Sequence, residues 1–288
     1  MKIYNNFILD STRWNEVKFR DDDIVVVTPY KSGTTWMQYI VMHLIIPKRK
    51  HFDLSSYSFW IEEKTKPIET VLNNIEQQAH RRCFKSHLPA DGIPIVDTVK
   101  YIFVGRDPRD VFMSLWNQYS NYTDDFYSMV NKDGNTLPQC PADIKELWSK
   151  WLTLGTSEYD TEGWPHWTNL RHIQTWWDAN KEHSNVMLIH YSDLIKDLDG
   201  GIAKVADFLN IKEYKDNISE LTSFTEMKRN ADIILPKSAK TYKKGNETFF
   251  NTGTNNKWID VLNSADLELY DRVSKSILSE ECKEWIEQ

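Results

Sequence analysis

The segment Thr28-Pro-Tyr-Lys-Ser-Gly-Thr-Thr-Trp36 has the residue types of an anion-binding loop. A glycine-containing loop that enters a helix presents backbone N–H groups and the positive end of the helix dipole to a ligand. Lys31, Thr34 and Thr35 add side-chain donors to this loop. An ordinary turn and helix cap would explain only its serine and its glycine, so we predict a P-loop-like site for a phosphate or a similar anion.

The spacing of this loop differs from that of a Walker A motif. The pattern GxxxxGK[ST] places a glycine six residues before the lysine. Here Lys31 comes two residues before Gly33, the only glycine of the loop. A small-molecule kinase with a variant phosphate loop stays open as an alternative, and it would require a Walker B-like aspartate after a strand and a dependence on magnesium.

A second charged segment runs from Val104 to Ser114. Arg106 precedes a predicted helix and Ser114 lies about two turns inside it, so a folded-back guanidinium could share an anion with this hydroxyl. A capped and charged helix start would explain these residues equally well, and both interpretations stay open. We expect Arg109 and Asp110 to form structural ion pairs.

A third segment, Phe84-Lys-Ser-His-Leu-Pro89, places His87 just after a short predicted strand and beside Lys85. A lone histidine is more often structural than catalytic. An imidazole whose ordinary pKa lies near neutrality is nevertheless suited to general base catalysis, so its role depends on the groups that lie near it.

These segments must be positioned by strands that alternate with helices. The predicted strands are Asp23–Thr28, Lys100–Val104 and Asn185–His190, and the predicted helices are Gly33–Ile46, a helix with Asp107 as its N-cap and Pro108 at its first position, and His166–Lys181. This alternation predicts an α/β fold with a central parallel sheet flanked by helices. Ligands of such sheets lie at the carboxyl ends of the strands, so we expect the three segments to converge there.

Composition favours one domain that spans residues 1–288, because the 10 Gly and 10 Pro are scattered and no repeat or linker marks a boundary. A formal charge of −7 with dispersed cations argues against nucleic-acid binding. The longest apolar run, Tyr39–Pro47, is too short to span a membrane, so we expect a soluble cytoplasmic protein. Cys83, Cys140 and Cys282 are spaced neither as a disulfide framework nor as metal ligands.

Together the three segments resemble those of the cytosolic-type sulfotransferases that use 3'-phosphoadenosine 5'-phosphosulfate (PAPS), and the chain is similar to a bacterial-like member. In that family the phosphosulfate loop reads PKSGTTW, the second anion motif reads RxxxDxxxS and the catalytic histidine lies in KTHLP. These motifs correspond, in the same order, to Tyr30–Trp36, Arg106–Ser114 and Lys85–Pro89. Asn185–Leu194 and Leu221–Lys228 extend the resemblance over nearly the whole chain.

The resemblance implies in-line transfer of a sulfuryl group from PAPS to a hydroxyl or amine of a small-molecule acceptor, with 3'-phosphoadenosine 5'-phosphate (PAP) as product and no metal. His87 would be the general base, Lys31 would neutralise charge on the leaving oxygen, and Lys85 would contact the sulfuryl oxygens. The implied donor-binding residues are Lys31, Ser32, Gly33, Thr34, Thr35, Trp36, Arg106, Ser114, Tyr191, Thr222, Phe224, Asn251, Thr252 and Gly253.

Within this set the resemblance assigns each group to a part of the donor. The loop threonines would hold the 5'-phosphate, and Arg106, Ser114 and the loop around Gly253 would hold the 3'-phosphate. The adenine would lie between two rings, with two further residues at its polar edge: Trp36 and Phe224 as the rings, Tyr191 and Thr222 at the edge.

One segment departs from the family pattern. The family loop resembles FFRKGxxGDW, whereas this chain has Phe249-Phe-Asn-Thr-Gly-Thr-Asn-Asn-Lys-Trp258, so that Asn251 and Thr252 replace the arginine and lysine that grip the 3'-phosphate. Three lysines are candidates to compensate: Lys243, Lys244 and Lys257. The end of the chain has no clear match to the KxxxTVxxxE dimer motif, so the oligomeric state stays open.

The acceptor pocket is the least readable part of the sequence. Its candidate residues, each equally explained as core, are Phe52, Tyr57, Trp60, Phe84 and the region Tyr122–Met129. The acidic residues Asp53, Glu62, Asp124 and Asp125 leave room for a cationic acceptor, although a solvated surface explains them as well. Because the loop has lost two cations, a second alternative also stays open: the chain could be a nucleotide-binding module that has kept the fold and lost catalysis.

Overall fold

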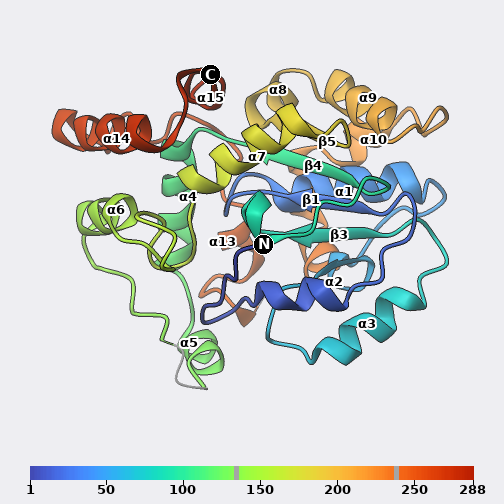
Figure 1. The fold of residues 1–288 in the computed structure, drawn as a ribbon, viewed down its shortest axis with the longest axis horizontal. Coiled ribbons are helices and arrows are strands. Elements are labelled where there is room, and N and C mark those ends of the chain that lie inside the picture. The colour runs from blue at the N-terminus through green and yellow to red at the C-terminus, as the bar shows by residue number, and fades with distance from the viewer. Residues whose placement is uncertain (133–135, 237–239) are drawn as a thin grey trace.

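The computed structural model of the chain describes residues 1–132, 136–236 and 240–288. Its centre is a sheet of parallel strands in the order β2-β3-β1-β4-β5 (Figure 1). The strands are β1 (Ile24–Val27), β2 (Ser58–Trp60), β3 (Cys83–Ser86), β4 (Lys100–Gly105) and β5 (Val186–His190). The predicted α/β fold with a central parallel sheet is therefore confirmed.

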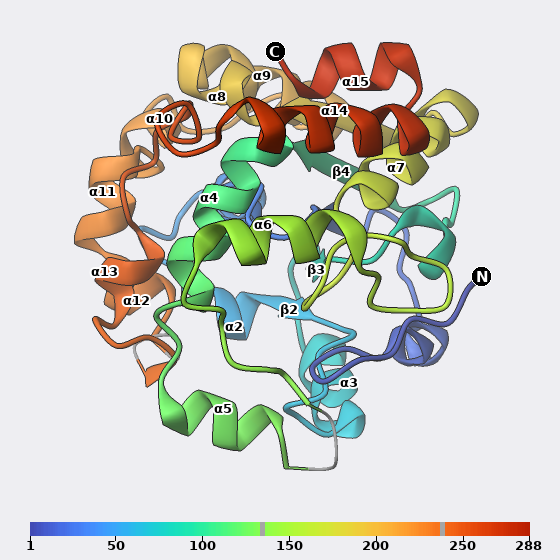
Figure 2. The same cartoon turned by 90° about the vertical axis from the view of Figure 1, so that its left-hand side faces the viewer.

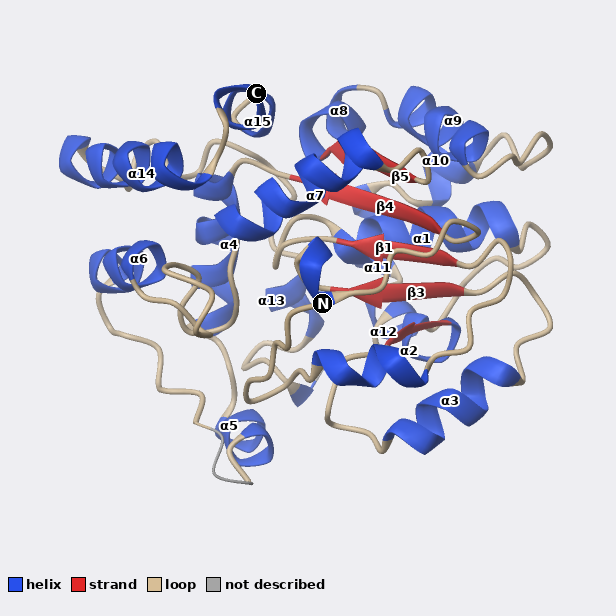
Figure 3. Ribbon diagram, in the orientation of Figure 1, coloured by secondary structure: helices blue, strands red, loops and turns tan. Residues whose placement is uncertain are grey.

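Helices cover both faces of this sheet (Figure 3). The α-helices are α1 (Thr34–Ile45), α2 (Leu54–Tyr57), α3 (Ile68–Glu76), α4 (Pro108–Tyr119), α5 (Asp124–Val130), α6 (Ile144–Thr153), α7 (Leu170–Glu182), α8 (Tyr191–Lys196), α9 (Leu198–Phe208), α10 (Ile218–Leu221), α11 (Phe224–Arg229), α12 (Ala231–Ile234), α13 (Asn246–Phe249), α14 (Ser264–Ile277) and α15 (Glu280–Ile286). Two 3-10 helices, η1 (Ser11–Glu16) and η2 (Ala90–Gly92), complete the described helices. In the described residues, no helix is long and apolar enough to cross a membrane.

The alternation of side chains along β1 divides the apolar interior into two cores. Val25 and Val27 enter the core that contains Trp176 of α7 and side chains of α3, α4, α6 and α14. Ile24 and Val26 enter the core on the other face, which contains side chains of α1, α8, α9 and α11. A strand buried on both faces has to be apolar throughout, which explains the run of β-branched residues in β1. On the first face, α6 packs along α14 (Figure 2).

The register of the strands brings their carboxyl ends to one edge of the sheet. Val27 of β1 is aligned with Ser86 of β3 and with Phe103 of β4, and Gly105 of β4 is aligned with His190 of β5. The loops that follow β1, β3, β4 and β5 therefore all start at this edge. This is the convergence that the sequence predicted for its three charged segments.

Two local differences separate the predicted from the observed elements. The helix predicted from His166 begins at Leu170, because the chain forms a turn at His166 and is irregular from 167 to 169. The short strand β2 was not predicted; it is three residues long and directly follows the short helix α2. The predicted start of α4 is confirmed, since the Asp107 side chain accepts a hydrogen bond from the backbone N–H of Arg109 at 2.8 Å.

Candidate active site

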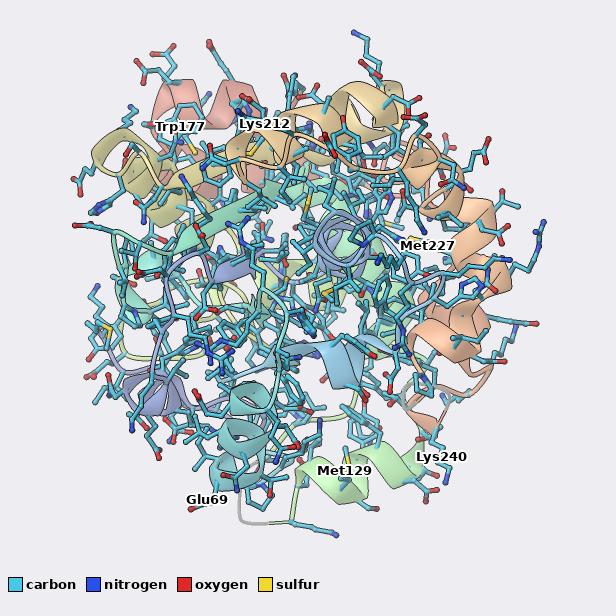
Figure 4. All side chains as sticks on the ribbon, turned by 90° about the vertical axis from the view of Figure 1, so that its right-hand side faces the viewer. Glu69, Met129, Trp177, Lys212, Met227 and Lys240 are labelled. Carbon is cyan, nitrogen blue, oxygen red and sulfur yellow. The ribbon has the colours of Figure 1, made fainter. Side chains whose placement is uncertain are left out.

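A cavity of about 1100 Å³ opens at the carboxyl edge of the sheet. The predicted site residues that line it are Lys31, Gly33, Thr34, Thr35, Trp36, Lys85, His87, Arg106, Ser114, Tyr191, Phe224, Asn251, Thr252 and Gly253. Its walls also include Met129 of α5, Met227 of α11 and Lys240, which come from three separate segments (Figure 4). The chain thus brings residues from nearly its whole length to one space.

The loop between β1 and α1 has the backbone of an anion cradle. Gly33 precedes α1 with φ of 103°, a left-handed conformation that glycine adopts without strain, and no side chain caps the helix. A Cβ atom at Gly33 would lie 2.9 Å from the Tyr191 ring, so the position also requires the smallest residue. The first N–H groups of α1 remain available for an anion, and this loop therefore fits a phosphate group.

Two lysines beside this loop are held in an environment that disfavours their charge. Burial lowers the pKa of the Lys31 ammonium to about 7, and repulsion from other cations, Arg106 first, acts in the same direction. Burial also lowers the pKa of Lys85 to about 8. The Lys31 ammonium lies 4.6 Å from the ring centre of Phe249, and that of Lys85 lies 4.2 Å from the ring centre of Trp60. An anion in the cavity would restore both positive charges.

His87 follows β3 and is held through one ring nitrogen. Its Nδ1 lies 3.0 Å from the carbonyl oxygen of Thr28 and 3.3 Å from the hydroxyl of the same residue. A carbonyl can only accept, so Nδ1 carries the proton and the lone pair lies on Nε2. Burial lowers the pKa of His87 well below its ordinary value, and repulsion from Lys85 lowers it further. The imidazole is therefore neutral near pH 7 and able to accept a proton.

Glu62 supports the segment that carries His87, and the sequence did not reveal this role. Its Oε1 accepts the backbone N–H of His87 at 2.7 Å and the Ser86 hydroxyl at 3.0 Å, and its Oε2 accepts the Trp14 indole N–H at 2.9 Å. Glu62 is fully buried, which raises the pKa of its carboxyl group. The interpretation that Glu62 could meet a cationic acceptor is therefore wrong, because both oxygens are already engaged inside the protein.

Arg106 joins three segments around the cavity. Its guanidinium donates to the Thr254 carbonyl at 3.1 Å, to the Asn255 side-chain oxygen at 3.2 Å and to the Lys31 carbonyl at 3.3 Å. The same group lies 4.4 Å from the ring centre of Tyr191. Arg106 thus connects the loop between β1 and α1 to the segment around residue 254.

The two neighbouring charges of the same helix start have structural partners. Arg109 donates to the Asp107 carboxylate at 2.7 Å, so its ion pair is with Asp107 and not with Asp110. Asp110 accepts the backbone N–H groups of Asn256 at 2.9 Å and Lys257 at 3.2 Å. The ion pair expected for Arg109 exists, whereas Asp110 binds backbone.

A family model described as a sulfotransferase domain matches residues 21–285. The chain belongs to the sulfotransferase family. The family predicted from the sequence motifs is therefore confirmed, and the kinase alternative is not favoured.

Relatives of known description cover most of the chain. A glycolipid sulfotransferase of Mycobacterium bovis is 30% identical over 95% of this chain and 90% of the relative. Sulfotransferase 1E1 of Bos taurus is 26% identical over 79% of this chain and 73% of the relative. The crystal structure of mouse sulfotransferase SULT7A1 complexed with PAP has a TM-score of 0.71 at 20% identity and covers 96% of this chain and 94% of that one. This last likeness shows the shared fold.

On the side of the cavity next to α11, aromatic residues and backbone form a slot. The Trp36 indole N–H donates to the Thr222 carbonyl at 2.8 Å, and the Trp36 and Tyr191 rings meet edge to face at 5.3 Å. Phe224 is 37% exposed, and a Cβ atom at Gly253 would lie 2.5 Å from its ring. Trp36 and Phe224 of this sulfotransferase both line the cavity, and their role as the rings beside the adenine stays a prediction.

Two of the predicted donor-binding side chains do not reach the cavity. Thr222 is fully buried and its hydroxyl donates to the Ile218 carbonyl at 2.8 Å, so it positions Trp36 through its backbone instead of contacting a ligand. The Ser32 side chain is also fully buried, and its hydroxyl has no hydrogen-bond partner among the described residues. Burial removes both hydroxyl groups from the cavity surface, and the place of Ser32 and Thr222 in the donor site stays a prediction.

The altered loop forms part of the cavity wall. Asn251, Thr252 and Gly253 all line the cavity, and the Thr252 and Thr254 hydroxyl oxygens are 3.1 Å apart. Of the three lysines that could compensate for the missing cations, only Lys257 lines the cavity. Lys243 instead donates to the Ser120 carbonyl at 3.1 Å on the surface.

The part of the cavity wall around His87 consists mostly of aromatic side chains. The residues on this side are Tyr30, Trp60, Tyr122, Phe126, Met129, His166, Trp167, Tyr242 and Phe249. The His87 ring meets Tyr30 at 5.6 Å, Trp60 at 5.2 Å and Trp167 at 5.3 Å between ring centres. Trp60 and the region 122–129 therefore contribute to the pocket as expected, whereas Phe52 and Phe84 belong to the buried core.

In the described part of the chain, no group of three or more His, Cys, Asp or Glu side chains is arranged to hold a metal ion. Around the phosphate-loop end of the cavity, the ammonium groups of Lys31 and Lys257 and the guanidinium of Arg106 favour an anion, whereas the carboxylates of Glu63 and Asp125 line other parts of the wall.

Proposed function

We propose that the protein transfers a sulfuryl group from PAPS to a hydroxyl or amine of a small-molecule acceptor. The observation that carries this proposal is the position of a neutral His87 with its lone pair on Nε2 in the cavity that also holds Lys31, Lys85 and the uncapped start of α1. The donor would supply the sulfuryl group, and PAP would leave.

The residues at the donor side fit an adenosine bisphosphate. The N–H groups at the start of α1, with Thr34 and Thr35, would hold the 5'-phosphate, and Trp36 and Phe224 would stack on the adenine. Lys31 would neutralise the charge that develops on the oxygen of the breaking S–O bond. The relation to a mouse sulfotransferase complexed with PAP supports this choice of nucleotide.

His87 would act as the general base. As the acceptor oxygen or nitrogen forms its bond to sulfur, its proton would pass to Nε2 of His87, while Lys85 stabilises the sulfuryl oxygens. The hydrogen bond from Nδ1 to the Thr28 carbonyl would keep the ring in the tautomer that this step needs and would stabilise the imidazolium that results.

The acceptor would enter on the aromatic side of the cavity. Rings such as Tyr30, Trp60 and Trp167 surround His87, and this lining favours an acceptor with substantial apolar surface around its reacting group. The Mycobacterium bovis relative is described as a glycolipid sulfotransferase, which is compatible with such a pocket.

Calorimetry without metal would test the donor assignment. We expect PAP to bind more tightly than adenosine 5'-phosphate and than ATP, because the site offers cations for two separate phosphates. Equal affinity for the three nucleotides, or ATP binding that depends on magnesium, would contradict the proposal.

A further inference from the structure

The altered loop from Phe249 to Trp258 differs from the family pattern in the positions of its charged residues. The family pattern FFRKGxxGDW has two cations before its first glycine and an acid before the tryptophan. In this chain the cations are replaced by Asn251 and Thr252, and the position of the acid is taken by Lys257. Two positive charges are therefore absent from one end of the loop, and one positive charge replaces a negative charge at the other end.

The backbone of this loop is fixed from α4. The two oxygens of the Asp110 carboxylate accept the N–H groups of Asn256 and Lys257 at 2.9 and 3.2 Å, and Arg106 donates to the carbonyl of Thr254 at 3.1 Å. Asn256 has φ of 67°, a left-handed conformation that asparagine adopts more readily than most residues, and the family pattern has glycine at this position. The loop can therefore keep its path although its residues have changed.

Lys257 faces the same space as the other cations of the donor site. It is partly buried and lines the cavity together with Arg106 and Ser114. Within the described part of the chain, no carboxylate forms an ion pair with it. Asp110, an acid that influences the pKa of Lys257, accepts hydrogen bonds from backbone N–H groups with both of its carboxylate oxygens.

The charges around this space are consistent with a site for a polyanion. Burial lowers the pKa of Lys257, repulsion from Arg106 lowers it further, and Asp110 acts in the opposite direction. Lys257 in turn contributes to lowering the pKa of Lys31. Cations that repel one another across a partly enclosed space are stabilised when an anion binds between them.

We propose that Lys257, together with Arg106 and Ser114, binds the 3'-phosphate of the donor in place of the two cations that Asn251 and Thr252 have replaced. The inference rests on the proposed function, because it assumes that the donor is an adenosine bisphosphate. It assigns to Lys257 a role in selecting that nucleotide over adenosine 5'-phosphate.

The test compares two nucleotides that differ only in the 3'-phosphate. Binding of PAP and of adenosine 5'-phosphate is measured by calorimetry for the unchanged protein, Lys257→Ala, Lys257→Arg and the control Lys244→Ala, which removes an exposed lysine that does not line the cavity. We expect Lys257→Ala to weaken PAP binding about 10- to 100-fold and to change adenosine 5'-phosphate binding less than about threefold. Lys257→Arg should retain most of the preference, and Lys244→Ala should retain all of it.

The outcomes separate this inference from the proposed function. If the unchanged protein prefers PAP and Lys257→Ala keeps that preference, the role of Lys257 is wrong and the donor assignment stands. The same conclusion follows if Lys257→Ala weakens the binding of PAP and of adenosine 5'-phosphate by the same factor, because the lysine would then not contact the 3'-phosphate. If the unchanged protein shows no preference, the donor assignment fails and the inference fails with it. Circular dichroism of each variant establishes that it is folded.

Discussion

The Nδ1 atom of His87 lies 3.0 Å from the carbonyl oxygen of Thr28, the first residue after β1. The Thr28 hydroxyl is in turn hydrogen bonded to the Thr34 hydroxyl at the start of α1. The proposed base and the anion loop are therefore connected through one residue. Adjacent parallel strands make this connection possible, because β1 and β3 end side by side.

Replacing His87 by Ala should separate catalysis from nucleotide binding. We expect the transfer rate to fall about 10²- to 10⁴-fold, the usual contribution of a positioned base, while PAP affinity stays within a few-fold of its original value. The measurements are a sulfuryl-transfer assay and calorimetry with PAP. His183→Ala, at the end of α7, is a control that should change neither quantity. A parallel loss of PAP binding in His87→Ala would show that the ring supports the donor site rather than the chemistry.

Nucleotide binding should weaken as the pH rises. In the free protein the pKa of Lys31 is about 7 and that of Lys85 is about 8. Both ammonium groups therefore lose their protons between about pH 7 and pH 9. Because an anion binds the protonated forms and raises their pKa, we expect PAP binding at pH 8 to take up protons and its affinity to fall between about pH 7 and pH 9. Calorimetry in buffers of different ionisation enthalpy measures this uptake.

A second variant identifies the group responsible for this pH dependence. Lys31→Arg carries a charge that does not titrate in the same range, so it should bind PAP with a flatter pH profile and less proton uptake. An unchanged profile in this variant would show that Lys31 keeps its proton in the free protein. In that case the repulsion among the cavity cations would be weaker than their geometry implies.

The supporting role of Glu62 predicts an ordered series of stability losses. Glu62→Ala leaves three buried donors without an acceptor, and we expect it to lower the free energy of unfolding by about 3 kcal/mol. Glu62→Gln keeps one oxygen for His87 and Ser86 but places an amide donor against the Trp14 indole N–H, so its loss should be smaller. Urea unfolding measures both changes. Glu63→Ala, one residue later and partly exposed, is the matched control and should lie within about 0.5 kcal/mol of the original protein.

The elements that carry the site were predictable where local sequence decides the structure. The buried strand β1 has a run of β-branched residues, and the start of α4 has an N-cap followed by proline, both of which are local signals. The strand β2 has no such signal, because Ser58–Trp60 is three residues long and is a strand only through its pairing with β3. The local sequence pattern thus predicted most strands of the sheet but not the edge strand β2.

The site itself was predictable by position but not by orientation. Motif spacing indicated which segments meet at the cavity, yet it did not distinguish the buried side chains of Ser32 and Thr222 from those that line the cavity. Glu62 was read as a surface acid because its role depends on contacts with segments far apart in sequence, including Trp14 and His87. Such contacts are a property of packing, and only the three-dimensional structure provides them.

The three hydrogen-bonding directions of Arg106 cannot be reproduced by a lysine. Its planar guanidinium reaches Thr254, Asn255 and Lys31 at the same time, whereas an ammonium on a flexible stem would hold one of them. We therefore expect Arg106→Lys to weaken PAP binding at least about 10-fold, although the formal charge is unchanged, because both the anion contact and the loop that carries Lys257 would lose their support.

The matched control for this variant lies on the same helix start. Arg109→Lys also replaces a partly buried guanidinium, but this guanidinium does not line the cavity; its ion-pair partner is Asp107, and it lies 4.2 Å from the ring centre of Trp258. We expect Arg109→Lys to lower the melting temperature without changing PAP affinity, and Arg106→Lys to change PAP affinity in particular. Limited proteolysis near Thr254 and Asn255, the two residues of this loop that Arg106 contacts, should be faster in Arg106→Lys than in Arg109→Lys. Equal affinities in the two variants would show that charge, rather than the fixed geometry of Arg106, holds the nucleotide.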